Sequence, residues 1–399
     1  MKRNLPIFIL IGMIVLIINS SFLHAGEVRG VTDDTIKIGV IMDQTGPGAN
    51  VSVPLTNALR SLVRFTNAQK GVHGRKIKLF VEDDRLAIPM AISAFKKLLF
   101  REKVFALIGP TGTGAITALA SNIEKEKIPV FSIPMPEFTV KPFKRYIFIP
   151  GDIYPNQMNV LIDYIVKDLK AKDSRISLVY PDVELGKVDL KAAMKRFGVY
   201  SIKPVSKEVV NFGTFDASSQ VMNLKRAKPD YVIQCGGVPQ PTSVLLKDMR
   251  KFGLNVPVFG TWACCAEEVM GMVGPAANKF HAASHMSSWY ENYPGAERMR
   301  SITLKYYPGT EKPYRGKVYT HGWVTAMLMI EGLKRAGRNL DEDSFIEGLE
   351  GIKNFDTGGL PCLISYSPTS HKGGDSWKIF KADPGSGKFI PITDWRKSE

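Results

Sequence analysis

The chain has 399 residues and 4 cysteines, and its 53 Lys and Arg against 38 Asp and Glu give a formal net charge of +15. This length is enough for two ordinary domains, each with its own core. Four cysteines exclude a disulfide scaffold, and the scattered lysines lack the basic stripe with interleaved aromatics that nucleic-acid binding requires. We therefore expect a two-domain globular protein with a basic surface and no nucleic acid among its partners.

The first 25 residues differ in composition from everything that follows. Two basic residues precede an apolar run from Leu5 to Ile18, and small or polar residues then lead to Ala25. This order is typical of a cleaved secretory signal peptide, here residues 1–25, and no cysteine lies near the cut to carry a lipid. A retained membrane anchor is the alternative, although the run is short for a bilayer span of roughly 20 residues. The sequence thus predicts export through a cleaved signal peptide.

After this leader, short β-type runs alternate with amphipathic stretches of helical length. The expected strands are Ile36–Met42, Lys76–Glu82, Val104–Ile108 and Ile128–Ser132, and the expected helices are Leu55–Gln69, Ile88–Arg101 and Thr113–Glu124. Strands that are joined by helical crossovers form a parallel sheet covered on both faces.

The same rhythm restarts near residues 146–152. It gives strands at Arg175–Tyr180, Ser206–Val210, Asp230–Gln234 and Val256–Gly260, and helices at Asn156–Leu169, Gly186–Phe197, Ala217–Ala227 and Val244–Phe252. Further segments follow these two sets: a strand-like stretch after Lys279, helices near Gly295–Lys305 and His321–Ala336, and a Gly- and Pro-rich end from Gly358. They indicate that the chain returns to each lobe through a hinge. We predict a first lobe of residues 30–149 plus 279–356 and a second of 150–278 plus 357–399.

The stretch VFALIGPTGTGAITALA (104–120) carries the strongest binding signal. A strand runs into a small polar loop, and a helix begins near Gly114. Free backbone N–H groups at a helix start attract anions, and Thr113 adds a hydroxyl donor. Gly112 and Gly114 let a ligand approach the backbone closely. A plain capped turn is the alternative, because Gly-rich turns between strand and helix are common in α/β sheets, and no P-loop lysine follows.

Metal and catalytic motifs are missing. The adjacent residues Cys264 and Cys265 cannot bridge each other without strain, CxxC spacing is absent, and the six histidines do not fall into ligand pairs. Together with Cys235 and Cys362 they are expected to be structural thiols or to form one bridge. No GxSxG elbow occurs. The sequence therefore favours a protein that is not an enzyme and that uses neither metal nor cofactor.

Several blocks, taken in order, resemble one family. They are IKIGVIMDQTGP (36–47), GVHGRKIKLFVEDD (71–84), the 104–120 stretch and IPVFSIP (128–134), followed later by YVIQCGG, FGTWA and HGWVTAMLMIEGLKRAG. Over nearly the whole chain they are similar to the type I periplasmic binding proteins of the branched-chain amino-acid (Leu/Ile/Val-binding) family. The resemblance implies two doubly wound α/β lobes joined by a three-crossover hinge. It also implies a ligand enclosed between the lobes and delivery to the permease subunits of an ABC importer. We expect the protein to act as a monomer.

The resemblance also implies where the first lobe would hold a ligand. The family's hydroxyl residue for the ligand carboxylate falls on Thr113. The next carboxylate-contacting segment falls on 133–136, which reads IPMP, so Pro136 stands where the family has a Thr. Pro134 and Pro136 have no N–H to donate and are expected to contribute through the backbone only.

In the second lobe the chain departs from the family. The Tyr and Glu that clamp the ligand ammonium fall on Val238 and Trp262, and Leu185 stands in place of a pocket Tyr. A buried ammonium without a carboxylate partner costs several kcal/mol. These positions therefore favour an aromatic or aliphatic carboxylate over an α-amino acid, with Trp262 as an aromatic wall. The alternative is that Glu267 or Glu268 restores the clamp for a branched-chain or other amino acid.

Two aromatic residues of the late helix, Tyr319 and Trp323, are expected on the hinge side of the pocket, although a Trp on an apolar helix is more often part of the core. A sensory ectodomain working with a membrane partner is a further alternative, because the same fold serves receptors.

Overall fold

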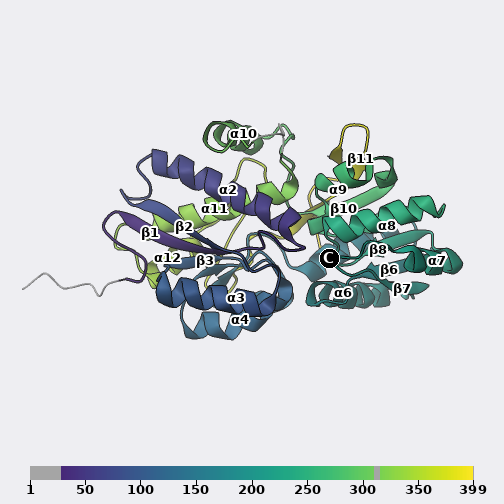
Figure 1. Cartoon of the computed structure of the whole chain (residues 1–399), viewed down its shortest axis with the longest axis horizontal. Coiled ribbons are helices and arrows are strands. Elements are labelled where there is room, and N and C mark those ends of the chain that lie inside the picture. The colour runs from purple at the N-terminus through teal and green to yellow at the C-terminus, as the bar shows by residue number, and fades with distance from the viewer. Residues whose placement is uncertain (1–27, 310–314, 399) are drawn as a thin grey trace, which may run out of the picture.

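The computed structural model describes residues 28–309 and 315–398, which form two α/β lobes side by side (Figure 1). The predicted signal peptide lies outside the described residues. None of the helices in the described parts of the chain combines the length and the apolarity that crossing a bilayer requires.

The first lobe is built on a five-stranded parallel sheet with the order β2-β1-β3-β4-β5. Its strands are β1 (Thr35–Ile41), β2 (Lys76–Glu82), β3 (Ala106–Ile108), β4 (Val130–Phe131) and β5 (Ile147–Phe148). Its helices are α2 (Ala49–Ala68), α3 (Ile88–Lys96), α4 (Thr113–Lys125), α10 (Pro294–Tyr306), α11 (Lys317–Ala336) and α12 (Glu342–Glu350). Helices α2 and α11 cover one face of the sheet, and α3 and α4 cover the other (Figure 1). Strands β3, β4 and β5 are buried throughout, which explains why they read as continuous apolar runs, whereas the edge strand β2 is partly exposed.

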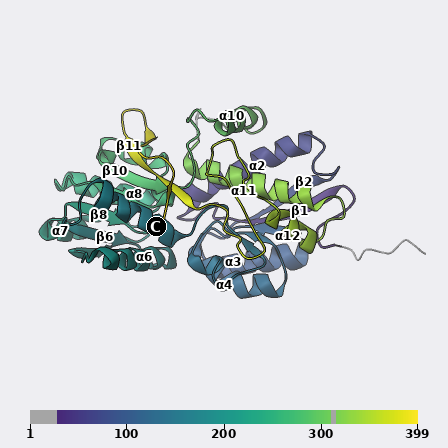
Figure 2. The same ribbon diagram turned by 180° about the vertical axis from the view of Figure 1, so that it is seen from behind.

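The second lobe holds a larger sheet with the order β12-β11-β10-β9-β8-β6-β7. Its strands are β6 (Ile176–Tyr180), β7 (Ser206–Val209), β8 (Tyr231–Gln234), β9 (Val258–Gly260), β10 (Phe280–Ser284), β11 (Ser376–Asp383) and β12 (Lys388–Pro391), with β13 (Arg396–Lys397) paired to β11. Its helices are α5 (Tyr154–Asp163), α6 (Glu184–Tyr200), α7 (Ser218–Ala227), α8 (Pro239–Lys251) and α9 (Glu268–Val273). The strands from β6 to β10 pair in parallel, whereas β11 and β12 add an antiparallel hairpin (Figure 2). The predicted doubly wound α/β fold is confirmed, with this hairpin as an addition.

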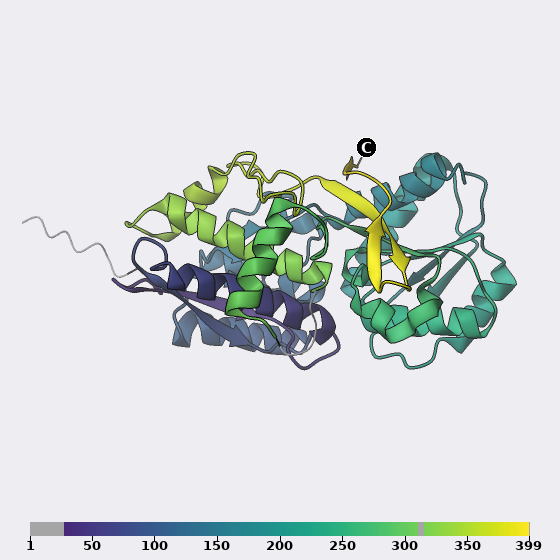
Figure 3. The same ribbon diagram turned by 90° about the horizontal axis from the view of Figure 1, so that it is seen from above.

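Three chain segments join the lobes: residues 149–153, 285–293 and 351–375. Figure 3 shows the junction from above. The first and third segments touch through a bridge between Ile149 and Lys372. Asp152 accepts hydrogen bonds from Lys372 Nζ at 2.9 Å and from Trp377 Nε1 at 3.0 Å. The Ser287 hydroxyl of the second segment donates to the Gly359 carbonyl of the third at 3.0 Å, so the three predicted crossovers form one packed junction.

One predicted lobe boundary is wrong. It assigned residues from 279 onward to the first lobe, but Phe280 pairs with Val258, so that β10 belongs to the second sheet. The chain returns to the first lobe only after Ser284. The backbone hydrogen bonds of a strand belong to the sheet in which it pairs, and a strand-like stretch of sequence does not reveal its neighbour.

Candidate ligand-binding site

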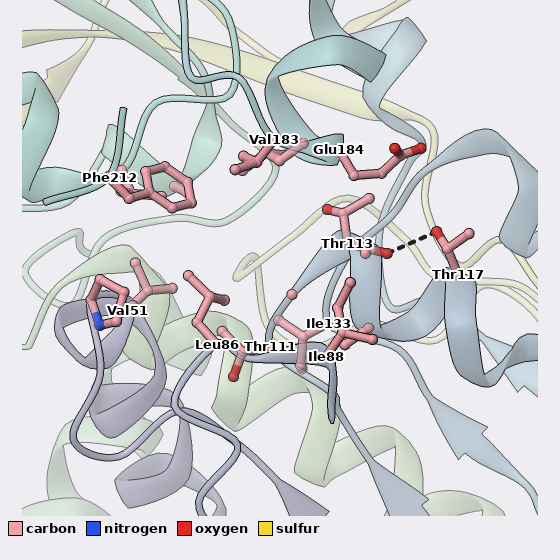
Figure 4. Close-up of a pocket in the computed structure, with 18 of the residues that line it drawn as sticks. Val51, Leu86, Ile88, Thr111, Thr113, Thr117, Ile133, Val183, Glu184 and Phe212 are labelled. Carbon is pink, nitrogen blue, oxygen red and sulfur yellow. Dashed lines mark hydrogen bonds between the residues drawn. The ribbon is translucent and has the colours of Figure 1, made fainter. Parts of the chain in front are cut away.

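A cavity of about 640 Å³ lies between the lobes at the carboxyl ends of the strands (Figure 4). In doubly wound sheets ligands bind at this edge. Walls come from both lobes, and a Cβ built at Gly114 would lie only 3.9 Å from the Cβ of Glu184 across the gap. The lining residues are Pro47, Gly48, Val51, Leu86, Ile88, Thr111, Gly112, Thr113, Gly114, Ala115, Thr117, Ala118, Ile133, Tyr154, Val183, Glu184, Leu185, Phe212, Val238, Trp262 and Ala263.

Six predicted site residues come together on this cavity, although they are distant in the sequence. They are Gly112, Thr113, Gly114, Leu185, Val238 and Trp262. Each follows the end of a strand: β3 for the first three, β6 for Leu185, β8 for Val238 and β9 for Trp262. The carboxyl ends of parallel strands meet at one edge, which is how the fold collects them.

Three other predicted residues do not line the cavity. Pro134 and Pro136 are buried, and their carbonyls accept hydrogen bonds from the hydroxyls of Ser132 and Thr139. Both carbonyls are therefore occupied within their own loop. Tyr319 is fully buried beside Trp289 in the first lobe, and its hydroxyl lies 2.9 Å from that of Thr303.

The loop before α4 brings its residues close to the ligand space. Gly109 has a φ of +114°, and a Cβ there would lie 2.2 Å from the carbonyl oxygen of Ile41, so this turn requires glycine. The Thr111 hydroxyl accepts from the Asp43 N–H at 2.8 Å, which ties the loop to the loop after β1. Thr113 opens α4, whose first N–H groups have no intrahelical acceptors. The Thr113 hydroxyl oxygen is buried and has no partner among the described residues.

A polar cluster forms where Thr113 and Trp262 approach Tyr154, a residue that sequence reasoning missed. Burial raises the pKa of Tyr154 well above its usual range, the Asp189 carboxyl acts in the same direction, and contacts from the Thr113 hydroxyl and the Trp262 side chain oppose it. The Trp262 indole N–H, like the Thr113 hydroxyl, completes no hydrogen bond to a described residue. Both groups thus approach the Tyr154 phenol on the cavity wall without reaching hydrogen-bond geometry. Tyr154 begins α5 directly after the first crossover, a position that marks it as a cleft residue.

The carboxyl of Asp189 lies behind this cluster and is buried. Burial raises its pKa to about 8, although the Gly236 N–H donates to it at 2.8 Å. Its protonated form is therefore favoured at neutral pH. This carboxyl does not line the cavity.

Apolar side chains make up most of the remaining wall. Ile88, Val183 and Phe212 come from both lobes and face the same space (Figure 4). Among the described lining residues Glu184 alone bears a charge, and its side chain is exposed to solvent. The described residues also contain no group of His, Cys, Asp and Glu side chains that could hold a metal ion, and all four cysteines are free thiols.

The acidic residues proposed as an alternative ammonium clamp are placed elsewhere. Glu267 is 2 % exposed and forms an ion pair with the equally buried Lys317, whose Nζ lies 2.7 Å from its Oε1. The same carboxylate accepts from the Lys317 N–H at 3.1 Å and from the Tyr290 hydroxyl at 2.8 Å. Glu268 is absent from the cavity lining. The alternative therefore lacks its carboxylate in this arrangement.

Two lobes that enclose a deep, largely apolar cavity at the carboxyl ends of parallel strands define a bilobed small-molecule binding protein. The chain belongs to the periplasmic binding protein family, whose model matches residues 35–388. Its members are solute-binding proteins and not enzymes, they act in the periplasm, and they serve ABC transporters together with permease subunits.

Similar proteins support this assignment over most of the chain. The "Leu/Ile/Val-binding protein homolog 3" of Brucella melitensis is 24% identical over 357 residues, which cover 88% of this chain and 92% of the relative. A branched-chain amino acid ABC transporter protein from Thermus thermophilus with bound valine shares the fold, with a TM-score of 0.85, 22% identity, and coverage of 92% and 98%. A fatty acid ABC transporter substrate-binding protein from Thermomonospora curvata has a TM-score of 0.81, 22% identity, and coverage of 94% and 95%.

Proposed function

We propose that this protein is the substrate-binding component of an ABC importer and that it binds a small carboxylate with an apolar body and no amino group. The observation that carries this proposal is the polar end of the cavity, where Thr113, Tyr154 and Trp262 bring together uncharged donors and no buried carboxylate is among the described lining residues. A leader that directs export and a permease that receives the ligand belong to the same proposal.

The hydrogen-bond donors of the cavity favour a carboxylate as the polar group of the ligand. A carboxylate only accepts hydrogen bonds, so it would satisfy the buried Thr113 hydroxyl and Trp262 N–H and could also engage the first N–H groups of α4. Leaving such donors unsatisfied costs about 1–3 kcal/mol each. A ligand carboxylate at this point would therefore supply the acceptors that both donors need.

The ammonium of an α-amino acid finds no comparable partner. Val238 is apolar, Trp262 offers only a donor and an aromatic face, Glu267 is bound to Lys317, and the protonated form of Asp189 is favoured at neutral pH. Breaking up an ammonium's hydration without a carboxylate in exchange costs several kcal/mol. The wall instead suits an aryl or alkyl body.

The names of similar proteins fit a carboxylate at the polar end, because valine and a fatty acid both carry one. They differ in the amino group, which keeps a branched-chain amino acid as the second candidate. Its support within this structure is Glu184, the charged side chain at the cavity, although that carboxylate is solvated. A sensory ectodomain would use the same site with a different membrane partner.

A thermal-shift comparison of matched pairs tests the proposal. Leucine is compared with 4-methylpentanoate, and phenylalanine with 3-phenylpropanoate, so each pair differs only in the amino group. The acids are expected to raise the melting temperature and the amino acids to leave it unchanged, because only ligands that bind the native state stabilise it. Stabilisation by leucine, isoleucine or valine alone would overturn the proposal.

A further inference from the structure

Two buried histidines meet at the junction of the lobes. His285 follows β10 at the start of the second crossover, and His321 lies on α11 in the first lobe. His285 Nε2 and His321 Nδ1 are 3.0 Å apart, which is a hydrogen bond, and the side chains are 2% and 0% exposed. In neutral imidazoles one nitrogen donates and the other accepts, so this bond requires that the two rings are not both protonated.

The histidine pair packs directly against the proposed ligand-binding tryptophan. Trp262 stacks on His321 with a centroid distance of 5.0 Å and an interplanar angle of 27°, and it meets His285 edge-on at 5.6 Å. Trp377 contacts the other side of His285 at 4.9 Å. A Cβ at Gly151 would lie 2.5 Å from His285 Cδ2, so the first crossover and β11 both pack against this ring of the second crossover.

Among the described residues no carboxylate forms an ion pair with either ring. Asp152 of the first crossover is paired with Lys372 of the third, and Lys317 of α11 is paired with Glu267, which precedes α9. From α5 the uncharged groups Gln157 and Tyr154 face Trp262, and the Gln157 Oε1 accepts a hydrogen bond from the backbone N–H of Trp262 at 2.8 Å. The remaining ring nitrogens, His285 Nδ1 and His321 Nε2, have no partner among the described residues.

We infer that His285 and His321 are positioning residues of the ligand site, which fix the orientation of Trp262 and make that orientation depend on the closure of the two lobes. The inference rests on the proposed function, because it concerns the same site. Trp262 belongs to the second lobe and His321 to the first, so separating the lobes breaks the stack. His285 sits in a crossover and connects both to the hinge.

A dependence on pH follows from the geometry. Burial lowers the pKa of His321 to about 3 and that of His285 well below its usual range. Both rings therefore stay neutral at physiological pH while the lobes hold them in contact. Once the lobes separate and water reaches the rings, each pKa returns toward its ordinary value of about 6.5. Protons then stabilise the open form below that pH. Ligand affinity should fall by up to about tenfold per pH unit for each ring that titrates.

The first test measures the dissociation constant of 4-methylpentanoate between pH 8 and pH 5 for the wild type and for H321F, H285Q and H281Q. H321F keeps an aromatic face for Trp262 but can neither titrate nor bond to His285. H281Q is the matched control, because His281 is another histidine of lowered pKa, stacked on Phe259 away from the site. H321F and H285Q should each flatten the pH profile, whereas H281Q should keep the wild-type slope. A merely structural role would shift affinity equally at all pH values, and an unchanged slope in both variants overturns the inference.

A second measurement needs no ligand and separates this inference from the proposed function. In protein labelled with 5-fluorotryptophan, the Trp262 resonance is assigned by its loss in W262F. H321A should move that resonance at pH 7.5, and H281Q should not. If the wild type binds none of the acids, the proposed function fails while the resonance still decides the inference. An unmoved resonance in H321A overturns it.

Discussion

Replacing Thr113 with Val should separate ligand binding from folding. The Thr113 hydroxyl is buried and has no hydrogen-bond partner among the described residues, and Val has nearly the same shape. Removing a buried unsatisfied hydroxyl spares a cost of about 1–3 kcal/mol, so the unliganded variant should be as stable as the wild type or more stable. The same substitution should weaken a bound carboxylate by about 1.5–3 kcal/mol, the usual contribution of a hydrogen bond to a charged group.

That range corresponds to a dissociation constant about 10- to 150-fold higher. Calorimetric titration with 4-methylpentanoate and its neutral amide measures the effect, and urea unfolding of the unliganded protein measures stability. The control is T113S, which keeps the hydroxyl and should keep most of the affinity. Equal losses for the acid and the amide, or a fall in stability that matches the fall in affinity, would refute the reasoning.

Three further substitutions probe the site and its support. W262A should weaken 4-methylpentanoate at least about 100-fold in calorimetry, because it removes an aromatic wall and a donor, and W262F should recover the part due to the ring. K317M should lower the free energy of unfolding in urea by about 3–5 kcal/mol, because it leaves Glu267 buried without its cation, and the double variant with E267L should recover much of that loss. The Asp189 pKa is raised from 3.8 to about 8, so the folded protein holds this proton more tightly than the unfolded chain does. The resulting contribution to the free energy of unfolding is complete below pH 3.8 and is lost as the pH rises toward 8. D189N should abolish that decline in urea unfolding between pH 4 and pH 8, and an unchanged decline would place its cause in another group.

The order of strands and helices was readable from the sequence because each parallel strand is a short apolar run between amphipathic helices. Helix starts were less accurate. Helix α2 begins at Ala49 instead of Leu55, with Pro54 inside it, and α8 begins at Pro239 instead of Val244. Pro239 stands in the first turn of α8, where the missing N–H of proline has no intrahelical acceptor. Pro54 lies beyond the first turn of α2, so a proline in the sequence does not settle where a helix starts.

Site residues were predictable where they follow strand ends and less so where a loop turns its groups inward. Thr113 and Trp262 line the cavity as predicted. The carbonyls of Pro134 and Pro136, in contrast, accept hydrogen bonds from hydroxyl groups of their own loop. Tyr154 was missed because it precedes an ordinary amphipathic helix, and only packing brings it to Thr113. The contacts of His285 with His321, which are 36 positions apart, depend on how the crossovers pack, which no local pattern encodes.

The matched pair of leucine and 4-methylpentanoate tests the central claim most directly. Calorimetric titration of the wild-type protein at pH 7.5 compares two ligands that share a carbon skeleton and differ only in the amino group that leucine carries. A cavity with donors but no buried acidic partner should bind 4-methylpentanoate at least about 100-fold more tightly, since an unpaired buried ammonium costs several kcal/mol. Tighter binding of leucine would show that the site provides a partner for the ammonium and would contradict the account.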